Sequence, residues 1–300
     1  AGTSLPKARR APPTHRLAHT PPPPHSRAPA FHASPGGGGI AYVGIFDFSI
    51  AGYYSPALSY YNRVGGAGRS DNIAEVASHE VGHNMGLNHD GRTDGTEYHS
   101  GAGNWGPIMG VSYGSDLSQW SKGEYLDANN FQDDLEIMQG KFGLRADEAG
   151  DAVATAASMT QLGSGSFEAT GVVAFEVNSG TYIQDVDVWA FEAGNAGPIS
   201  VTVTPWLAGS RTAGQNFVPL VQVLNGASSV LGAAAATAPG VGVTVQTVVP
   251  AAGTYYVSIR GTATVDSYVY GSVGQYDVTA LAPIVPTTLP PATTTTTTAA

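Results

Sequence analysis

Residues 79–90 read HEVGHNMGLNHD, a pattern that can bind a metal ion and activate water. On a helix His79 and His83 lie on one face because they are four residues apart, so both imidazoles can bind the same ion. Glu80 lies one step round the helix, close to a metal-bound water rather than to the metal. His89 supplies a third nitrogen. Three protein ligands leave the fourth position open, which is typical of catalytic rather than structural zinc.

The chain around this motif must form a helix followed by a sharp turn. Residues 72–85 are predicted to be helical, with Asn72 as the N-cap and Glu75 in the capping-box position three residues later. Gly86 then allows the backbone to leave the helix with a positive φ, which brings His89 back to the ion. The predicted buried stripe of the helix consists of Ile73, Val76, Ala77 and Val81.

The motif resembles that of the metzincin zinc peptidases, and Asp90 after the third histidine is similar to the reprolysin, or adamalysin-like, branch. Residues 106–110, GPIMG, resemble the family's Met-turn, which implies that Met109 forms a hydrophobic floor beneath the zinc. Residues 39–44 resemble the family's edge strand, which runs antiparallel to bound substrate. Residues 119–125 continue the resemblance, and a helix near residues 131–141 closes the lobe.

Two departures from the family pattern bear on this interpretation. Tyr113 follows Met109 by four residues rather than two, so we expect no tyrosine ligand, which disfavours the astacin-like and serralysin-like branches. The family also builds several strands and a long helix before its edge strand. Residues 1–37 are rich in Pro, Arg and His and are expected to be disordered, since they cannot form a sheet. The resemblance therefore implies an α+β metzincin-like catalytic lobe over residues 38–145, truncated and with an incomplete upper sheet.

After about residue 146 the composition shifts to Gly, Ala, Val, Thr and Ser. Short alternating runs predict an all-β, antiparallel, jelly-roll-like sandwich over residues 146–282. Residues 185–191, 250–257 and 274–278 resemble the bacterial pre-peptidase C-terminal domain, which commonly follows secreted peptidases. Residues 283–300 read as a Pro/Thr-rich linker or tail. The predicted strands are residues 171–177, 185–191, 199–204, 218–224, 241–249, 254–259 and 275–281.

Composition excludes several other classes of function. The net charge of the 300-residue chain is −10, and residues 1–46 hold five basic and no acidic residues, so the remaining 23 acidic and 8 basic residues give −15. An acidic body disfavours nucleic acid as a partner. The absence of Cys excludes disulfides, thiol catalysis and Cys-ligated zinc. No apolar run reaches transmembrane length, and no signal peptide stands in this sequence, so a secreted location rests on the resemblance.

One catalytic zinc ion is the cofactor that these residues predict. His79, His83 and His89 would bind it, and Glu80 would act as general base. Calcium is a second candidate, at Asp185 and Asp187 of the sandwich or in the acidic loop of the lobe; a solvated acidic surface is the competing interpretation. The acidic loop contains Asp133, Asp134 and Glu136.

Two functions from different classes remain open. The first is a zinc-dependent endopeptidase that hydrolyses peptide bonds of extracellular proteins. The second is a non-catalytic extracellular binding or adhesion protein that keeps a vestigial zinc site. Both would bind zinc, but only the first would hydrolyse a protein or peptide substrate. The sequence leaves the cleavage preference and the oligomeric state open.

Overall fold

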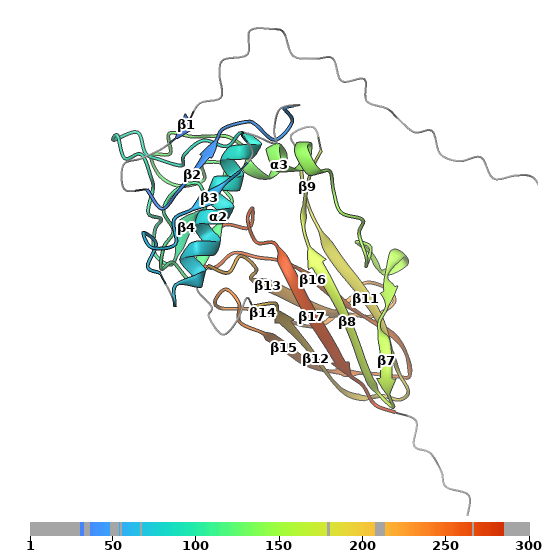
Figure 1. The fold of residues 1–300 in the computed structure, drawn as a ribbon. Helices are drawn as coiled ribbons and strands as arrows, with labels where there is room; N and C mark the ends of the chain where they lie inside the picture. The colour runs from blue at the N-terminus through green and yellow to red at the C-terminus, as the bar shows by residue number, and fades with distance from the viewer. Residues whose placement is uncertain are drawn as a thin grey trace, which may run out of the picture.

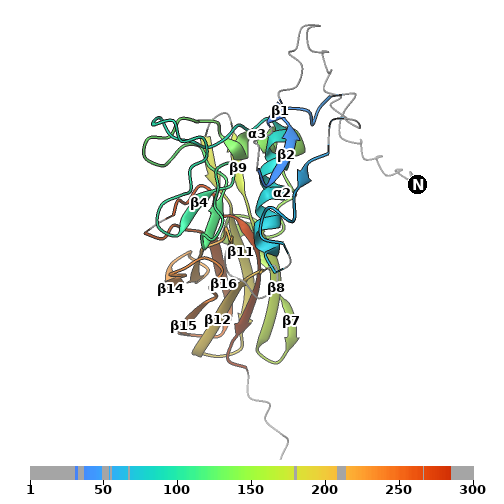
Figure 2. The ribbon, with the colours of Figure 1, turned by 60° about the vertical axis from the view of Figure 1, so that its left-hand side comes forward.

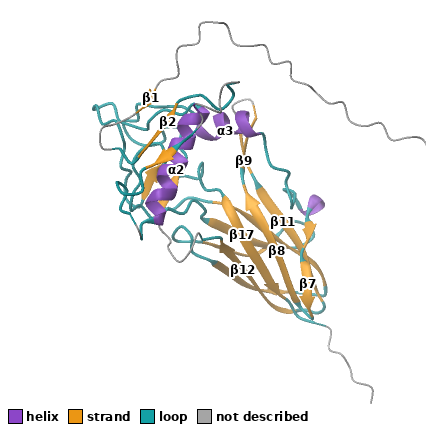
Figure 3. Cartoon of the chain, in the orientation of Figure 1, coloured by secondary structure: helices purple, strands orange, loops and turns teal. Residues whose placement is uncertain are grey.

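The computed structural model consists of a lobe with two helices and a larger body of β-sheet (Figure 1). The helices α2 (Ser70–Met85) and α3 (Asp134–Phe142) lie together at one end of the molecule, and the strands of the two large sheets fill the other (Figure 3). No helix among the described residues is long and apolar enough to span a bilayer. The structure describes residues 31–32, 37–48, 54, 56–66, 68–178, 181–207, 214–265 and 267–284.

A small antiparallel sheet lies against α2, as Figure 2 shows for its central strand. Its order is β1 (Phe31–His32), β2 (Gly39–Tyr42) and β3 (Leu58–Ser59). The expected edge strand, β2, is therefore the middle strand: it pairs with β1 through Ala41 and Tyr42, and with β3 through its first two residues.

The expectation that nothing before residue 38 joins a sheet is thus wrong at β1. This strand falls in a proline-free stretch between Pro29 and Pro35, so its backbone N–H groups remain available for pairing. The rest of residues 1–37, apart from Gly37, and the tail from residue 285 lie outside the described residues, so the expected disorder there stays a prediction.

Helix α2 begins two residues earlier than predicted. Arg69 is the N-cap, and Asn72 is buried inside the first turn, where its amide donates to the Val64 carbonyl oxygen at 3.0 Å. The predicted capping box is therefore wrong, because the amide of Asn72 serves a tertiary contact. The apolar stripe is also wrong in part. Val76 is buried, but Ala77 and Val81 are exposed, since the inward face carries polar residues. These buried polar residues include Glu80, His83 and Asn84.

Gly82 provides the space in which Met109 packs against α2. A Cβ at Gly82 would lie 2.6 Å from the Met109 sulfur and 3.2 Å from the Trp120 ring, and Met109 is completely buried. Glycine inside a helix costs about 1 kcal/mol relative to alanine. That cost is offset here by the close approach of the segment around Met109 to the helix.

We predict that Gly82→Ala destabilises the metal-free protein by about 1 kcal/mol, because overpacking of 1–3 kcal/mol exceeds the gain in helix propensity. Gly140→Ala is the matched control, since a Cβ at this position in α3 meets nothing within 4 Å. The control should stabilise the protein by up to about 1 kcal/mol. Denaturant unfolding measures both, and equal stabilisation by the two substitutions would contradict the packing argument.

The body contains two five-stranded sheets, compatible with the expected sandwich, that enclose one apolar core. One has the order β14-β13-β16-β11-β6 and the other β15-β12-β17-β8-β7. All neighbouring strands in them are antiparallel except β6 and β11, which are parallel. The strands are β6 (Ala157–Ser158), β7 (Thr160–Gly163), β8 (Ser166–Val173), β11 (Val186–Ala193), β12 (Gly197–Pro205), β13 (Pro219–Leu224), β14 (Val230–Ala235), β15 (Val243–Val249), β16 (Gly253–Gly261) and β17 (Gly274–Leu281).

The first predicted strand, residues 171–177, is divided in the structure. Strand β8 ends at Val173, and β9 (Phe175–Asn178) forms a separate hairpin with β10 (Thr181–Gln184) beside α3. A short 3₁₀ helix, Val153–Thr155, precedes β6.

Backbone pairing joins the lobe to the body. Strand β5 (Leu117–Gln119) lies parallel to β4 (Trp105–Pro107) and also forms a bridge to Gln215 of the body. The Ser118 N–H donates to the Gln215 carbonyl oxygen at 3.2 Å, and the Gln215 N–H donates to that of Asp116 at 3.2 Å. The loop before β13 therefore extends the two-stranded sheet formed by β4 and β5.

Buried side chains reinforce this junction. Gln119 is completely buried; its amide donates to the Asn216 carbonyl oxygen at 3.2 Å, and its own oxygen accepts from the Trp105 ring nitrogen at 2.9 Å. The Tyr270 hydroxyl donates to Asp133 at 2.7 Å and accepts from the Leu135 N–H at 2.8 Å, at the start of α3. The lobe and the body therefore pack against each other and are not joined by the connecting chain alone.

Candidate metal centre

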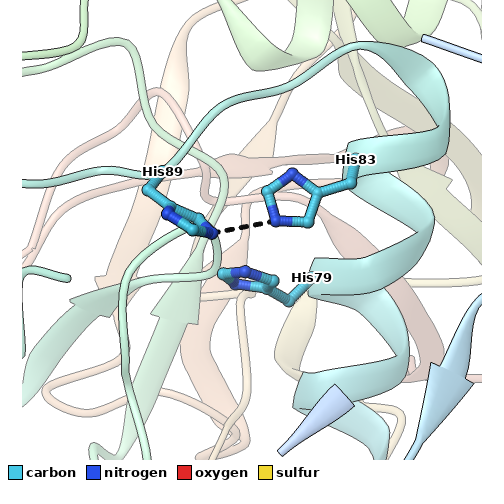
Figure 4. Close-up of side chains that lie close together, drawn as sticks. All are labelled: His79, His83 and His89. Atoms are coloured by element: carbon cyan, nitrogen blue, oxygen red, sulfur yellow. Dashed lines mark hydrogen bonds between the residues drawn. The ribbon is translucent and has the colours of Figure 1, made fainter. Parts of the chain in front are cut away.

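Three imidazole rings converge beside the last turns of α2 (Figure 4). His79 and His83 come from the helix, one turn apart, and His89 comes from the loop that follows it. One ring nitrogen from each residue lies within 4.8 Å of the others, and the Nε2 atoms of His83 and His89 are 3.0 Å apart. The structure therefore brings together all three histidines that the sequence predicts as ligands.

Each ring is oriented by a hydrogen bond from its Nδ1 atom. His79 bonds to the Ile108 carbonyl oxygen at 2.8 Å, and His83 bonds to the Leu87 carbonyl oxygen at 2.7 Å. His89 bonds to a carboxylate oxygen of Glu97 at 3.0 Å. Since all three partners are acceptors, each Nδ1 carries the hydrogen, and each neutral ring then presents an Nε2 lone pair.

Nε2 lone pairs that face one another at this spacing can bind one cation together. Two nitrogens bound tetrahedrally to zinc at 2.0–2.1 Å would be roughly 3.4 Å apart, close to the 3.0 Å between the two Nε2 atoms of His83 and His89. A neutral imidazole whose Nδ1–H binds a carbonyl or carboxylate is the usual arrangement of a zinc ligand. The donor set and its outer hydrogen bonds fit a zinc ion.

Burial keeps His79 in the form that binds metal. Burial, together with the neighbouring His83, lowers the pKa of His79 to about 4, although the Ile108 hydrogen bond acts to raise it. At neutral pH the ring is therefore unprotonated, and a metal ion need not displace a proton from it.

The turn after α2 has the conformation that the sequence predicts. Gly86 has φ 110°, and its N–H donates to the His83 carbonyl oxygen at 2.9 Å. The N–H of the next residue, Leu87, donates to the Gly82 carbonyl oxygen, and the Leu87 carbonyl oxygen accepts from the His83 ring. The turn that ends the helix therefore also orients a ligand. The Gly44 N–H donates to the same His83 carbonyl oxygen at 2.8 Å, which ties the segment after β2 to this helix end.

Glu80 lies buried between α2 and β2. One carboxylate oxygen, Oε2, is buried and has no hydrogen-bond partner among the described residues. Burial raises the pKa of Glu80 to about 7. A Cβ at Gly39 would lie 2.5 Å from Oε1, so only glycine allows β2 to approach the carboxylate this closely. A buried oxygen without a partner is costly, so this carboxylate can accept a hydrogen bond from a ligand.

Several residues around the centre carry no sequence signal. Glu97 and Tyr98 come from an irregular loop, yet Glu97 orients His89 and the Tyr98 ring lies 4.2 Å from the His89 ring. The pKa values of Tyr98 and Tyr113 are both raised to about 12, mainly by burial and in part by the Glu80 charge, so both hydroxyls stay protonated at neutral pH. Nothing in the spacing of these residues relative to the motif predicts their positions.

The segment 106–110, which resembles a Met-turn in sequence, packs against α2. Its Ile108 carbonyl oxygen holds His79, and the Met109 side chain packs against Gly82. The Asp90 N–H donates to the Met109 carbonyl oxygen at 2.8 Å, so the residue after the third histidine fixes this segment. Met109 is completely buried against the helix, and its role as a floor beneath a zinc ion stays a prediction.

The acidic residues of the lobe's loop form hydrogen bonds at the start of α3. Asp133 is the N-cap and accepts from the Glu136 N–H at 3.0 Å, and the buried Asp134 accepts from the Ser121 N–H at 3.0 Å. Asp134 and Glu136 lie in the first turn of this helix. The acidic residues of the sandwich form a cluster. One carboxylate oxygen from each of Asp147, Asp185 and Asp187 lies within 4.8 Å of the other two.

Part of the chain is similar to a known protein family. Residues 27–90 match the metallopeptidase family M12B, reprolysin-like. The reprolysin-like segment includes β1, β2 and all three histidines, so it begins upstream of Gly38, where the sequence resemblance was expected to start. It supports a metallopeptidase over that segment.

No curated protein sequence matches the chain. Among solved structures, the pre-peptidase C-terminal domain of a Bacillus anthracis collagenase is 11% identical, with a TM-score of 0.25, over 46% of this chain and 99% of that one. An arabinose-bound α-L-arabinofuranosidase is 10% identical, with a TM-score of 0.20, over 45% of this chain and 20% of that one. Neither likeness bears on what this chain does.

We predict that the chain binds one zinc ion and that His83→Ala weakens binding by at least about 10²-fold, because two ligands replace three. His25→Ala, which removes a histidine outside the motif, is the control and should bind zinc like the parent. Competition with a chromogenic chelator measures both affinities. Parental affinity in His83→Ala would reject the assignment of this ligand.

Proposed function

We propose that this protein is a zinc-dependent endopeptidase, secreted and acting on extracellular proteins. The family match supports a metallopeptidase. The observation that carries the proposal is the unpartnered Oε2 of Glu80, buried on the residue next to His79 beside three converging imidazoles. A vestigial binding site would keep the histidines but would give this carboxylate no role.

His79, His83 and His89 would hold the zinc ion, which supplies Lewis acidity and lowers the pKa of a bound water toward about 7. Glu80 would accept a proton from the attacking water and pass it to the amine that leaves. Its raised pKa suits this exchange, because a base near pH 7 can both take and return a proton. Tyr98 and Tyr113 offer protonated hydroxyls as donors near Glu80.

Calcium belongs to the proposal as a second cation. Asp147 precedes the body, and Asp185 and Asp187 flank the start of β11, so binding would fasten the connecting segment to the sheet. Asp187 is buried; one oxygen accepts from the Tyr276 hydroxyl, and the other has no partner among the described residues. Carboxylate oxygens are the ligands that Ca²⁺ prefers.

We predict that Glu80→Gln keeps zinc and fold but lowers kcat/KM on unfolded protein substrates by about 10²–10⁴-fold, because the proton acceptor is lost. Glu168→Gln, the same substitution at an exposed position of β8, should leave the activity unchanged. Release of fluorescent peptides from labelled casein measures the rates. Equal activity of the zinc-loaded parent and Glu80→Gln would reject the role of Glu80.

We further predict that, without divalent cations, the body is less stable at pH 8 than at pH 5. Burial raises the pKa of Asp187 to about 7 and that of Asp185 to about 6, so the folded state favours the protonated acids. The stability that they contribute is fully present below their unfolded pKa near 4, and it is lost as the pH rises through 6 and 7.

Calcium should therefore raise the melting temperature more at pH 8 than at pH 5. Asp187→Asn should remove most of both the pH dependence and the calcium response, whereas Asp277→Asn, at an exposed residue of β17, should keep both. Thermal unfolding followed by tryptophan fluorescence, with and without EDTA, provides the measurement. A calcium response that survives in Asp187→Asn would argue against this site.

A further inference from the structure

A cavity of about 300 Å³ lies between α2 and the body, beside the metal centre. The helix contributes Glu75 and Ser78 to its wall, the Met-turn segment contributes Ile108, and the loop before β13 contributes Gln215 and Asn216. The cavity therefore exists only because the body is docked on the lobe. Its volume is at the lower limit of ligand pockets, a size suited to one side chain rather than a large molecule.

The cavity is lined by residues that are neighbours of the proposed metal ligand His79 in the sequence or in space. Glu75 precedes His79 by one helical turn, roughly 6 Å along the axis, and lies on the same face of α2. Ser78 is the residue before His79, and the Ile108 carbonyl oxygen holds the His79 ring. Successive residues of an extended peptide are roughly 3.3–3.6 Å apart. A side chain close to the bond under attack can therefore reach this cavity.

The polar groups of the cavity include acceptors that lack a cationic partner. Glu75 is half-buried; one oxygen accepts from the Ser112 hydroxyl at 2.8 Å, and the carboxylate forms no salt bridge with any described residue. Burial raises the pKa of Glu75 and outweighs the Ser112 hydrogen bond and the Arg69 charge, which lower it. The buried side-chain oxygen of Asn216 is also without a partner among the described residues.

This combination matches one kind of side chain. A cationic head would pair with Glu75 and bind the Asn216 oxygen, and an aliphatic stem would lie along Ile108 and Ala74. An acidic or neutral polar side chain would leave the carboxylate unpaired or repelled. The net charge of −10 favours the approach of basic substrates over acidic ones.

We propose that this cavity binds the Lys or Arg side chain of a residue next to the scissile bond, with Glu75 as the carboxylate that determines specificity. The inference rests on the proposed peptidase function and deepens it. It also gives the body a part in substrate recognition, because Gln215 and Asn216 form one wall of the cavity.

The test compares two peptides that differ at one residue. Cleavage sites are first mapped by mass spectrometry in a digest of an unfolded protein by the zinc-loaded full chain. A quenched fluorescent peptide is then made with Arg at the selected position, and a second with citrulline, its neutral isostere. The parent should cleave the Arg peptide roughly 10–100-fold faster in kcat/KM, the range of a charge-assisted hydrogen bond.

Glu75→Gln should remove this preference, so that the Arg and citrulline peptides are cleaved with similar kcat/KM. The amide can still accept from Ser112, so the fold is retained. Glu136→Gln, at an exposed residue of α3, is the matched control and should keep the preference. The proposal is overturned if the parent shows no preference for Arg, or if the preference survives in Glu75→Gln. Either result leaves the peptidase function standing.

A binding measurement separates this proposal from the proposed function. Isothermal titration in the Glu80→Gln background should give tighter binding of the Arg peptide than of the citrulline peptide, and adding Glu75→Gln should remove the difference. If the parent cleaves no peptide but this difference is found, the cation-binding cavity stands and the peptidase function falls. Equal binding of the two peptides overturns the cavity proposal independently of turnover.

Discussion

The metal centre depends on three ring N–H groups, each of which needs an acceptor that holds its imidazole in place. Buried donors are costly without partners, so each imidazole is fixed by the acceptor that the fold supplies to its Nδ1. These acceptors come from three places: the turn after α2, the segment beneath the helix and an irregular loop. The left-handed Gly86, the close packing of Met109 on Gly82 and the exposed Glu97 all serve this one requirement.

The ligands were predictable from sequence, whereas their supports were not. Helical periodicity and a glycine turn are local rules, and they suffice to bring His79, His83 and His89 together. The Ile108 carbonyl oxygen and Glu97 act through tertiary contacts that no spacing rule encodes. The prediction of an apolar buried stripe on α2 was wrong in part for a related reason. Apolar periodicity assumes that the inward face is apolar, and here that face carries Glu80, His83 and Asn84.

Most strands of the body were predictable because each buries one face, which produces alternation. Strand β14 was missed, since Gly and Ala in VLGAAA alternate weakly. The junction was not predictable either, because Gln119 reads as an ordinary surface residue until Trp105 and Asn216 are seen beside it. In the same way, Asp147 joins Asp185 and Asp187 only through folding. Composition located a change of architecture, but it could not indicate that the two parts pack together.

The shared interface has a consequence for a molecule whose chain is cut at its surface. The connection between α3 and the body, residues 143–151, is irregular and largely exposed, so it is an accessible place for a cut. The bridge at Leu117, the buried Gln119 and the common apolar core cross the junction elsewhere, so a nicked molecule would remain assembled. Before folding, the same connection has a different role: it sets the effective concentration at which the two halves meet. Once they have docked, the contacts at Leu117 and Gln119 hold them together as well.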